Sequence, residues 1–369
     1  NVVRSSYMSR RLRAVGICVV SIALVWLVLK DVELDQVVAA FAAARIDFIF
    51  LALLLTCFSY VVRAIRWRYL LRPLGVIGIG MTLRATLIGF ALTAILPGRV
   101  GEIVRPYLLA RREGLSATSV FATVVIERIL DLVSILLIFG ASVVVFNPDF
   151  VVQDDQLLRG IYLGAVFATF GALVALALAR VVAKRPELVV KCSEWLSKRC
   201  SRRVSSAIVG GTEDFVRGFG VMLKLRVLGW SMSWSLVLWG TIVIGLWLVS
   251  MSFGIQVPLS GAGVILVLVA VGVAIPTPAG VGGYHAAYQI GTTGLYDASA
   301  EAAVGAGLVA HAISFLPVMA VGLVLMVKEG MHFHDVSQLS VVDSAEKRQL
   351  DSKAGRPKQQ FGGDGEVLP

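Results

Sequence analysis

The stretch ILPGRVGEIVRPYLLARREGLSATSVFATVVIERILD, residues 95–131, places charged side chains inside two otherwise apolar segments. Glycine, proline, arginine and glutamate interrupt the first segment at residues 97–105, and Glu127, Arg128 and Asp131 lie within the second. Each charge at the centre of a membrane span costs roughly 2.5 to 3.5 kcal/mol on insertion scales. These side chains must therefore face protein or water, which makes this stretch the first candidate for function.

The composition of the whole chain is that of a polytopic membrane protein. Of its 369 residues, 57% are hydrophobic and 16% are charged, and the mean hydropathy is +0.83. Soluble domains are roughly 45–50% apolar and about 25% charged. Because a helix needs about 20 residues to cross the hydrocarbon core, the eight hydrophobic segments predict an all-α fold with about six full spans and two broken, re-entrant segments.

The net charge of +10 is explained by orientation in the membrane, not by binding to nucleic acid. Lysine and arginine cluster between apolar runs, where the positive-inside rule places them on the cytoplasmic side. We therefore expect a multi-pass protein of the cytoplasmic (inner) membrane, with both termini inside and no nucleic-acid partner. The four cysteines lack the spacing of a metal site or a disulfide framework. We expect no metal and no cofactor, assign no catalytic residue, and favour a transporter over an enzyme.

One arginine cluster follows the apolar run at residues 48–62. Arginines at the end of a span favour the cytoplasmic interface, and tryptophan and tyrosine are enriched in the aromatic belt at that level. The sequence thus predicts that the following residues mark the inner surface of the membrane: Arg63, Arg66, Trp67, Arg68, Tyr69 and Arg72.

The chain divides into a transmembrane domain at residues 1–327 and a tail at residues 328–369. The tail is polar and low in aromatic residues, which predicts disorder. Within the domain, residues 180–226 form a basic cytoplasmic loop. Its interleaved apolar residues favour amphipathic helices on the anionic inner leaflet, and a solvated loop is the alternative.

A second broken segment, AGVILVLVAVGVAIPTPAGVGGYHAAYQ at residues 262–289, shares the plan of the first. Both have an apolar run, a Gly/Pro break, a loop and a long span, giving repeat units at about residues 74–146 and 262–326. The charge bias makes the first unit enter from inside and the second from outside, so we predict an inverted repeat, which in transporters brackets a midplane site. Chance similarity is the alternative. At an offset of 181, Pro97, Val100 and Gly101 match Pro278, Val281 and Gly282.

The string LPGRVGEIVRPYLLARREGLSATSVFATVVIERILDL, together with IPTPAGVGGYHAA, resembles the lysylphosphatidylglycerol synthase transmembrane region family, described as flippase-like integral membrane proteins. The resemblance covers most of residues 10–328 and implies translocation of a lipid. In the two-part bacterial members, a separate soluble domain makes the aminoacylated lipid. We expect no such synthase domain after Lys328, and other members are linked to polyprenyl-linked sugars, so the identity of the lipid stays open.

Arg99, Glu102 and Arg105 are spaced i, i+3, i+6, which places them on one face of a helix. Together with Gly98 and Gly101 beside the break, they are the candidate headgroup site, in which the two arginines would hold a lipid phosphate. An exposed row of ion pairs is the alternative.

Glu127, Arg128 and Asp131 form a candidate intramembrane charge network. Arg128 and Asp131 are three residues apart and can pair, which leaves Glu127 to accept Arg99 or Arg105. A proton or counter-ion relay and a structural tether between helices are the two interpretations. His311 aligns with Asp131 at an offset of 180 and is assigned to the same network, with a simple hydrogen-bonded histidine as the alternative. In the second break, a gating role is assigned to Pro276, Pro278, Gly280, Gly282, Gly283, Tyr284 and His285.

The leading functional hypothesis is translocation of an anionic phospholipid or polyprenyl-linked lipid through a central charged cavity. The expected partners are membrane lipids with anionic headgroups and a separate lipid-synthesising enzyme. The sequence has no GxxxxGK[ST] motif, so a gradient or the concentration difference of the lipid would drive movement. A non-transporting scaffold is one alternative. Another is a membrane glycosyltransferase or lipid-modifying enzyme that uses a polyprenyl-phosphate donor, with outer carboxylates among Asp31, Glu33, Asp35, Asp154 and Asp155.

The inverted repeat makes a testable prediction about topology. Single cysteines at Gly98 and Gly280 should react with a membrane-impermeant maleimide from opposite aqueous faces of oriented vesicles. Labelling of both positions from the same face would rule out the inverted arrangement.

Overall fold

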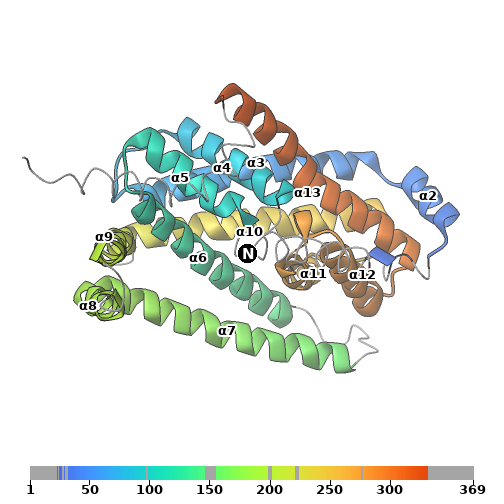
Figure 1. Cartoon of the computed structure of the whole chain (residues 1–369). Helices are drawn as coiled ribbons and strands as arrows, with labels where there is room; N and C mark the ends of the chain where they lie inside the picture. The colour runs from blue at the N-terminus through green and yellow to red at the C-terminus, as the bar shows by residue number, and fades with distance from the viewer. Residues whose placement is uncertain are drawn as a thin grey trace, which may run out of the picture.

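The computed structural model describes residues 32–96, 99–145, 155–197, 202–220, 224–275 and 277–330, together with Ala23, Val25, Trp26 and Leu29. All regular structure in these ranges is helical (Figure 1). Most of the first predicted span, the outer loop after residue 145 and the tail beyond residue 330 lie outside the described residues, as do Pro97, Gly98 and Pro276.

The helices follow one another along the chain with short connections. In order they are α2 (Leu34–Ala43), α3 (Ile46–Leu71), α4 (Ile79–Ile95), α5 (Gly101–Glu113), α6 (Ala117–Val145), α7 (Asp155–Lys184), α8 (Pro186–Ser197), α9 (Arg202–Phe219), α10 (Leu225–Ser252), α11 (Leu259–Ala274), the 3₁₀ turn η3 (Pro278–Gly280), α12 (Gly283–Tyr296) and α13 (Ala300–Lys328).

Three of these helices are long and apolar enough to cross a membrane by length and composition: α3, α10 and α13. Helix α6 is equally long at 29 residues but carries Glu127, Arg128 and Asp131. The outer face of α3 exposes large apolar side chains such as Phe50 and Phe58, which suits contact with lipid tails. The prediction of an all-α, multi-pass membrane protein is confirmed, whereas the number of spans and the re-entrant character of the broken segments stay predictions.

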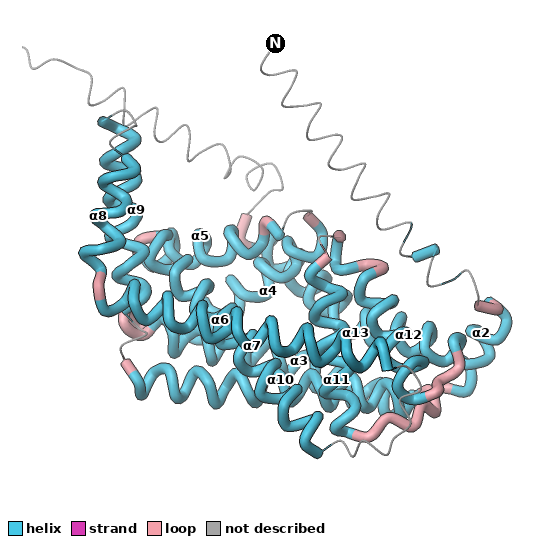
Figure 2. The backbone as a smooth tube through the Cα atoms, turned by 90° about the horizontal axis from the view of Figure 1, so that it is seen from below, coloured by secondary structure: helices cyan, strands magenta, loops and turns pink. Residues whose placement is uncertain are grey.

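Helices α3 and α10 lie side by side through the middle of the molecule (Figures 1 and 2). The buried apolar residues form two main clusters beside this pair. One joins the C-terminal half of α3, including Trp67 and Leu70, to α4, α5 and α6. The other joins α10 to α11, α12 and α13 around Ile265 and Tyr288. The central pair therefore connects two separately packed cores.

Each core contains a helical hairpin, and the two hairpins share unusual details. Helices α4 and α5 have 17 and 13 residues, and α11 and α12 have 16 and 14. Glycine lets the backbones touch at both crossings, because a Cβ on Gly101 would lie 1.9 Å from the Gly89 carbonyl oxygen and one on Gly283 would lie 2.2 Å from that of Gly272. Both breaks also contain a non-glycine residue with left-handed backbone angles, Arg99 (φ 54°) and Ala279 (φ 52°).

The hairpins lie toward opposite ends of the central pair. Helices α4 and α5 lie toward the end that carries α8 and α9, and α11 and α12 lie toward the end that carries α2 (Figures 1 and 2). Their breaks nevertheless meet, because Nη2 of Arg99 donates a hydrogen bond of 3.0 Å to the carbonyl oxygen of Val273 near the end of α11.

The basic segment at residues 180–226 contains two helices, α8 and α9, as the amphipathic pattern predicts. Helix α9 is fixed to α6, since both Ser116 and Ser119 donate hydrogen bonds of 2.7 Å to Asp214, the first to its carboxylate and the second to its carbonyl oxygen. The two helices stand side by side at one end of the molecule (Figure 2). Their position on a lipid surface stays a prediction.

The glycine crossing gives the first prediction from the structure. Gly101→Ala should lower the melting temperature of the detergent-solubilised protein by several degrees, because its methyl group must push α4 from α5 and overpacking costs about 1–3 kcal/mol. Gly140→Ala in α6 is the matched control, since a Cβ there meets nothing within 4 Å. Equal melting temperatures for the two variants would show that the crossing tolerates a side chain.

Candidate functional site

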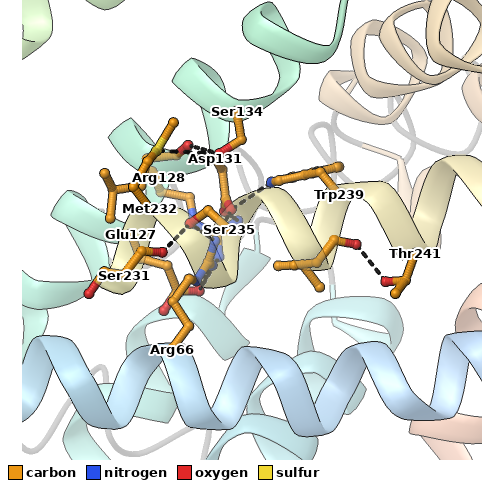
Figure 3. Close-up of polar contacts among 12 residues, drawn as sticks. Arg66, Glu127, Arg128, Asp131, Ser134, Ser231, Met232, Ser235, Trp239 and Thr241 are labelled. Atoms are coloured by element: carbon orange, nitrogen blue, oxygen red, sulfur yellow. Dashed lines mark hydrogen bonds and ion pairs between the residues drawn. The ribbon is translucent and has the colours of Figure 1, made fainter. Parts of the chain in front are cut away.

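Five charged side chains from three helices meet inside the helix bundle and form what we call the charge cluster. Arg66 comes from α3 and Arg105 from α5, while Glu127, Arg128 and Asp131 come from α6. Figure 3 shows four of them together with the serine and tryptophan side chains of α10. Buried charges are tolerated when they are paired, and every member of this cluster has an ion-pair partner, although some buried atoms, such as Oε2 of Glu127 and Nε of Arg105, have no hydrogen-bond partner.

Glu127 is the centre of the cluster. Its side chain is fully buried, and Oε1 lies 3.0 Å from Nη2 of Arg66, from Nη1 of Arg105 and from Nη2 of Arg128. A single carboxylate oxygen thus holds α3 and α5 against α6. The guanidinium of Arg105 also stacks over Trp67 at 3.8 Å from the ring centroid, and Nε1 of Trp67 donates to Thr123 on α6. These contacts fix Arg105 from two sides.

Asp131 adds α10 to the cluster. Its Oδ1 accepts hydrogen bonds from Nη1 of Arg66 at 2.5 Å and from Nε1 of Trp239 at 2.9 Å, and its Oδ2 lies 3.4 Å from Nη1 of Arg128. Nη1 of Arg66 also donates to the hydroxyl of Ser235 at 2.9 Å. Figure 3 shows Arg66, Ser235 and Trp239 converging on Asp131.

The cluster is not electrically neutral. Three guanidinium groups face two carboxylates, so one positive charge is in excess. The side chains of Arg66 and Arg105 are 0% and 3% exposed, whereas that of Arg128 is 38% exposed. Arg128 is therefore the most accessible guanidinium of the cluster, and the carboxylate of Glu102 also acts on it electrostatically.

The predicted pair of Arg128 with Asp131 is present, and of the two partners predicted for Glu127 it is Arg105, and not Arg99, that forms the ion pair. Arg66 and Trp67, predicted to mark the inner surface of the membrane, are buried inside the bundle, because α3 continues as a helix to Leu71 and both side chains are 0% exposed. Their depth in the membrane stays a prediction. A signal was available in the sequence: Ser59, Val62 and Arg66 repeat at i, i+3 and i+7, the spacing of one inward helix face. The length of the apolar run alone does not indicate this inward face, because the run ends before Arg63.

The candidate headgroup residues do not all lie together. Arg105 is buried in the charge cluster, whereas Arg99 and Glu102 are more exposed and pair at 3.6 Å. Gly101 lies in the crossing of α4 and α5. Gly98 is outside the described residues. Arg99 is thus the residue of this set whose charge is both exposed and only loosely paired.

The residues of the second break surround His311, which lies with them and not with the carboxylates. Its Nε2 is 2.9 Å from the carbonyl oxygen of Ala279, and its ring lies 4.6 Å from that of His285 and 5.2 Å from that of Tyr284. Nδ1 of His285 accepts a hydrogen bond of 3.3 Å from the amide of Gly282. This aromatic group packs against a turn that Pro278, Gly280, Gly282 and Gly283 shape.

A cavity lies beside this second break. It has a volume of about 90 Å³ and is lined by α3, α10 and α13, with Tyr284 of α12 at its wall. The expected cavity carried Arg99 and Arg105, but the lining of this one contains neither; its cation is Arg63. Arg63 was missed as a site residue for the same reason as Arg66.

Comparison with known proteins shows what the chain resembles. The sequence profile of the lysylphosphatidylglycerol synthase TM region matches residues 14–322. A UPF0104 membrane protein of Methanocaldococcus jannaschii is 24% identical over 216 residues, 58% of this chain and 62% of the relative. Another, of Pyrococcus horikoshii, is 21% identical over 64% of this chain and 73% of the relative. Glycosyltransferase AglD of Haloferax volcanii is 23% identical over 83% of this chain, which is 53% of its own length.

The charge balance of the cluster gives a prediction about stability. Glu127→Gln should raise the excess from one positive charge to two and destabilise the protein by about 3–5 kcal/mol, because buried guanidinium groups lose their counter-charge. The double variant Glu127→Gln with Arg128→Gln returns the excess to one and should melt at a higher temperature than the single variant.

The control for this prediction is Arg128→Gln alone, which leaves two guanidinium groups facing two carboxylates and should be the mildest of the three. The measurement is the melting temperature of purified protein in detergent. A double variant that melts below Glu127→Gln would show that charge balance does not govern the cluster.

Proposed function

Because the chain belongs to the lysylphosphatidylglycerol synthase transmembrane region family, we propose that it moves an anionic phospholipid or polyprenyl-linked lipid across the cytoplasmic membrane. The observation that carries this proposal is the surplus positive charge of the charge cluster, accessible at Arg128 within a 29-residue apolar helix. Ionisable residues inside a membrane bundle are a mark of substrate and ion pathways.

A purely structural role leaves that surplus unexplained. Two arginines and two carboxylates would tie α3, α5 and α6 together with no net charge, at a lower cost of desolvation. The third arginine is the half-exposed one, which suits a side chain that exchanges its partner for the phosphate of a passing lipid. Bidentate contact with phosphate is a property of the guanidinium group.

The paired hairpins support an alternating mechanism. Their equal plan and their places at opposite ends of α3 and α10 are what two re-entrant units entering from opposite sides would give. The hydrogen bond from Arg99 at one break to the carbonyl oxygen of Val273 at the other connects the two hairpins, so that movement of one hairpin would strain or break this bond. In this proposal the aromatic group at His311 closes one side of the path.

A second candidate function is transfer of a sugar from a polyprenyl-phosphate donor. It is favoured by the relative named a glycosyltransferase, which aligns with 83% of this chain. The alignment covers about half of that relative, so its activity need not reside in the shared part. Incubation of the purified protein with a labelled polyprenyl-phosphate sugar tests this candidate directly, and transfer of the label to any acceptor would favour it over translocation.

Vesicles that contain the purified protein and fluorescent phosphatidylglycerol test the translocation proposal. Dithionite quenches the outer-leaflet probe directly, and with the wild type we expect it also to quench the inner-leaflet probe, because the protein moves that probe outward. For Arg99→Ala this second phase should be at least tenfold slower, because an exposed cation that can bind the phosphate is lost. Alanine suits that backbone, since Ala279 has the same left-handed angles. Arg111→Ala, an exposed change on the same hairpin, should match the wild type. Quenching identical to that of empty vesicles, for every anionic lipid tried, would refute translocation.

A further inference from the structure

The cavity beside the second break contains an arginine that the charge cluster does not use. Arg63 lies on α3 one turn before Arg66 and lines the cavity. Among the described residues, no carboxylate forms an ion pair with Arg63, and its buried Nε has no hydrogen-bond partner. A half-buried cation with no direct ion pair is costly, and Asp131, the carboxylate that acts on Arg63 electrostatically, is already paired with Arg66 and Arg128. An anion in the cavity would therefore gain a contact with Arg63 that the described chain leaves open.

Three aromatic rings hold the side chain of Arg63 in place and carry no charge that would neutralise it. Its guanidinium carbon lies 4.9 Å from the ring centroid of Phe90, 5.8 Å from that of Trp239 and 5.9 Å from that of Tyr60. Cation–π contacts contribute about 0.5–2 kcal/mol but leave the donors of the guanidinium unpaired. The ring of Trp239 lies against Arg63, while its N–H is bound to Asp131.

The rest of the cavity wall contains several hydroxyl groups that already donate their hydrogen to a backbone carbonyl oxygen. Thr56, Ser59 and Ser314 donate to carbonyl oxygens of their own helices, and the hydroxyl of Tyr60 donates to the carbonyl oxygen of Ser314 at 2.9 Å. Their remaining lone pairs can accept hydrogen bonds. The cavity therefore offers one unpaired cation and several acceptors, which fits a phosphate group that carries a hydroxyl or ammonium substituent.

The position of the cavity favours a lipid as the source of this phosphate. The adjoining outer face of α3 exposes Leu51, Leu54 and Phe58, and α13 exposes Leu316 two residues after the cavity residue Ser314. Acyl chains can lie against these side chains while the headgroup enters the cavity. Gly245 of α10 is buried and lines the cavity. A Cβ atom added at this glycine would have no other heavy atom within 4 Å, so the space beside this wall is empty.

We propose that this cavity binds the phosphodiester headgroup of an anionic phospholipid through Arg63, with the hydroxyl-lined wall accepting hydrogen bonds from the headgroup. The recognised chemistry is the phosphate, which a free phosphate ion shares. The proposal deepens the proposed function, on which its choice of a lipid rests, by naming where a headgroup is held.

The test measures binding and not movement, so that it can succeed or fail independently of translocation. The protein in detergent is titrated with dioctanoyl phosphatidylglycerol, with dioctanoylglycerol, which lacks the phosphate, and with inorganic phosphate, and the melting temperature is followed. We expect phosphatidylglycerol to raise the melting temperature of the wild type and dioctanoylglycerol to leave it unchanged. Arg63→Gln should weaken the apparent affinity at least tenfold, and Arg68→Gln, an exposed arginine on the same helix, should not.

A second pair of variants keeps the test decisive if Arg63→Gln does not fold. Gly245→Leu fills the empty wall of the cavity and should also weaken binding at least tenfold, whereas Gly240→Leu, on the same helix but outside the cavity lining, should not. An equal response to inorganic phosphate that depends on Arg63 would keep the phosphate site and reject the lipid as its source. Binding unchanged in both Arg63→Gln and Gly245→Leu, or no binding to the wild type, would overturn the proposal.

Discussion

The contact of one carboxylate oxygen with three guanidinium groups is the interaction on which this structure depends. Oε1 of Glu127 draws side chains of α3, α5 and α6 to a single point, in surroundings where each charge alone would be expelled. Asp131 extends the arrangement to α10 through Trp239. The helices that carry these residues cannot slide or rotate independently, because any such movement separates charges that no solvent can compensate. The ion pairs and hydrogen bonds of the cluster therefore fix the register of these helices, whereas apolar packing alone would allow many registers.

The second constraint is steric. Two glycine crossings let α4 touch α5 and α11 touch α12 at backbone distance, so each hairpin folds back on itself within helices too short to span a bilayer comfortably. The same solution appears twice, with a left-handed residue at each break. The two hairpins differ in chemistry, since α5 and the following α6 carry arginines and carboxylates, whereas α12 and the following α13 carry the aromatic group around His311. The two hairpins thus share the same backbone features but are surrounded by side chains of different chemistry.

The class of protein and the main features of the charge cluster could be predicted from the sequence, because hydrophobic length and the cost of intramembrane charge act locally. The pair of Arg105 with Glu127 follows from counting unpaired charges on neighbouring segments. Arg66 does not follow from such counting, since a charge at the end of an apolar run can lie at the interface or in the bundle, and its spacing from Ser59 and Val62 is the sequence signal that favours the bundle. The place of His311 depends on tertiary packing: sequence alignment of the repeats matches it to Asp131, but the hairpin beside it determines its neighbours.

The position of Trp239 has a consequence for communication inside the molecule. One side chain gives its N–H to Asp131 and its ring to Arg63, so the charge cluster and the cavity share a part. Thermodynamic linkage makes such sharing reciprocal: an anion that displaces Arg63 changes the energy of the Asp131 hydrogen bond, and a rearrangement at Asp131 changes the affinity for that anion by the same factor. In the proposed binding of an anion, occupancy of the cavity and the hydrogen bond that ties α6 to α10 would therefore depend on each other through a single indole ring.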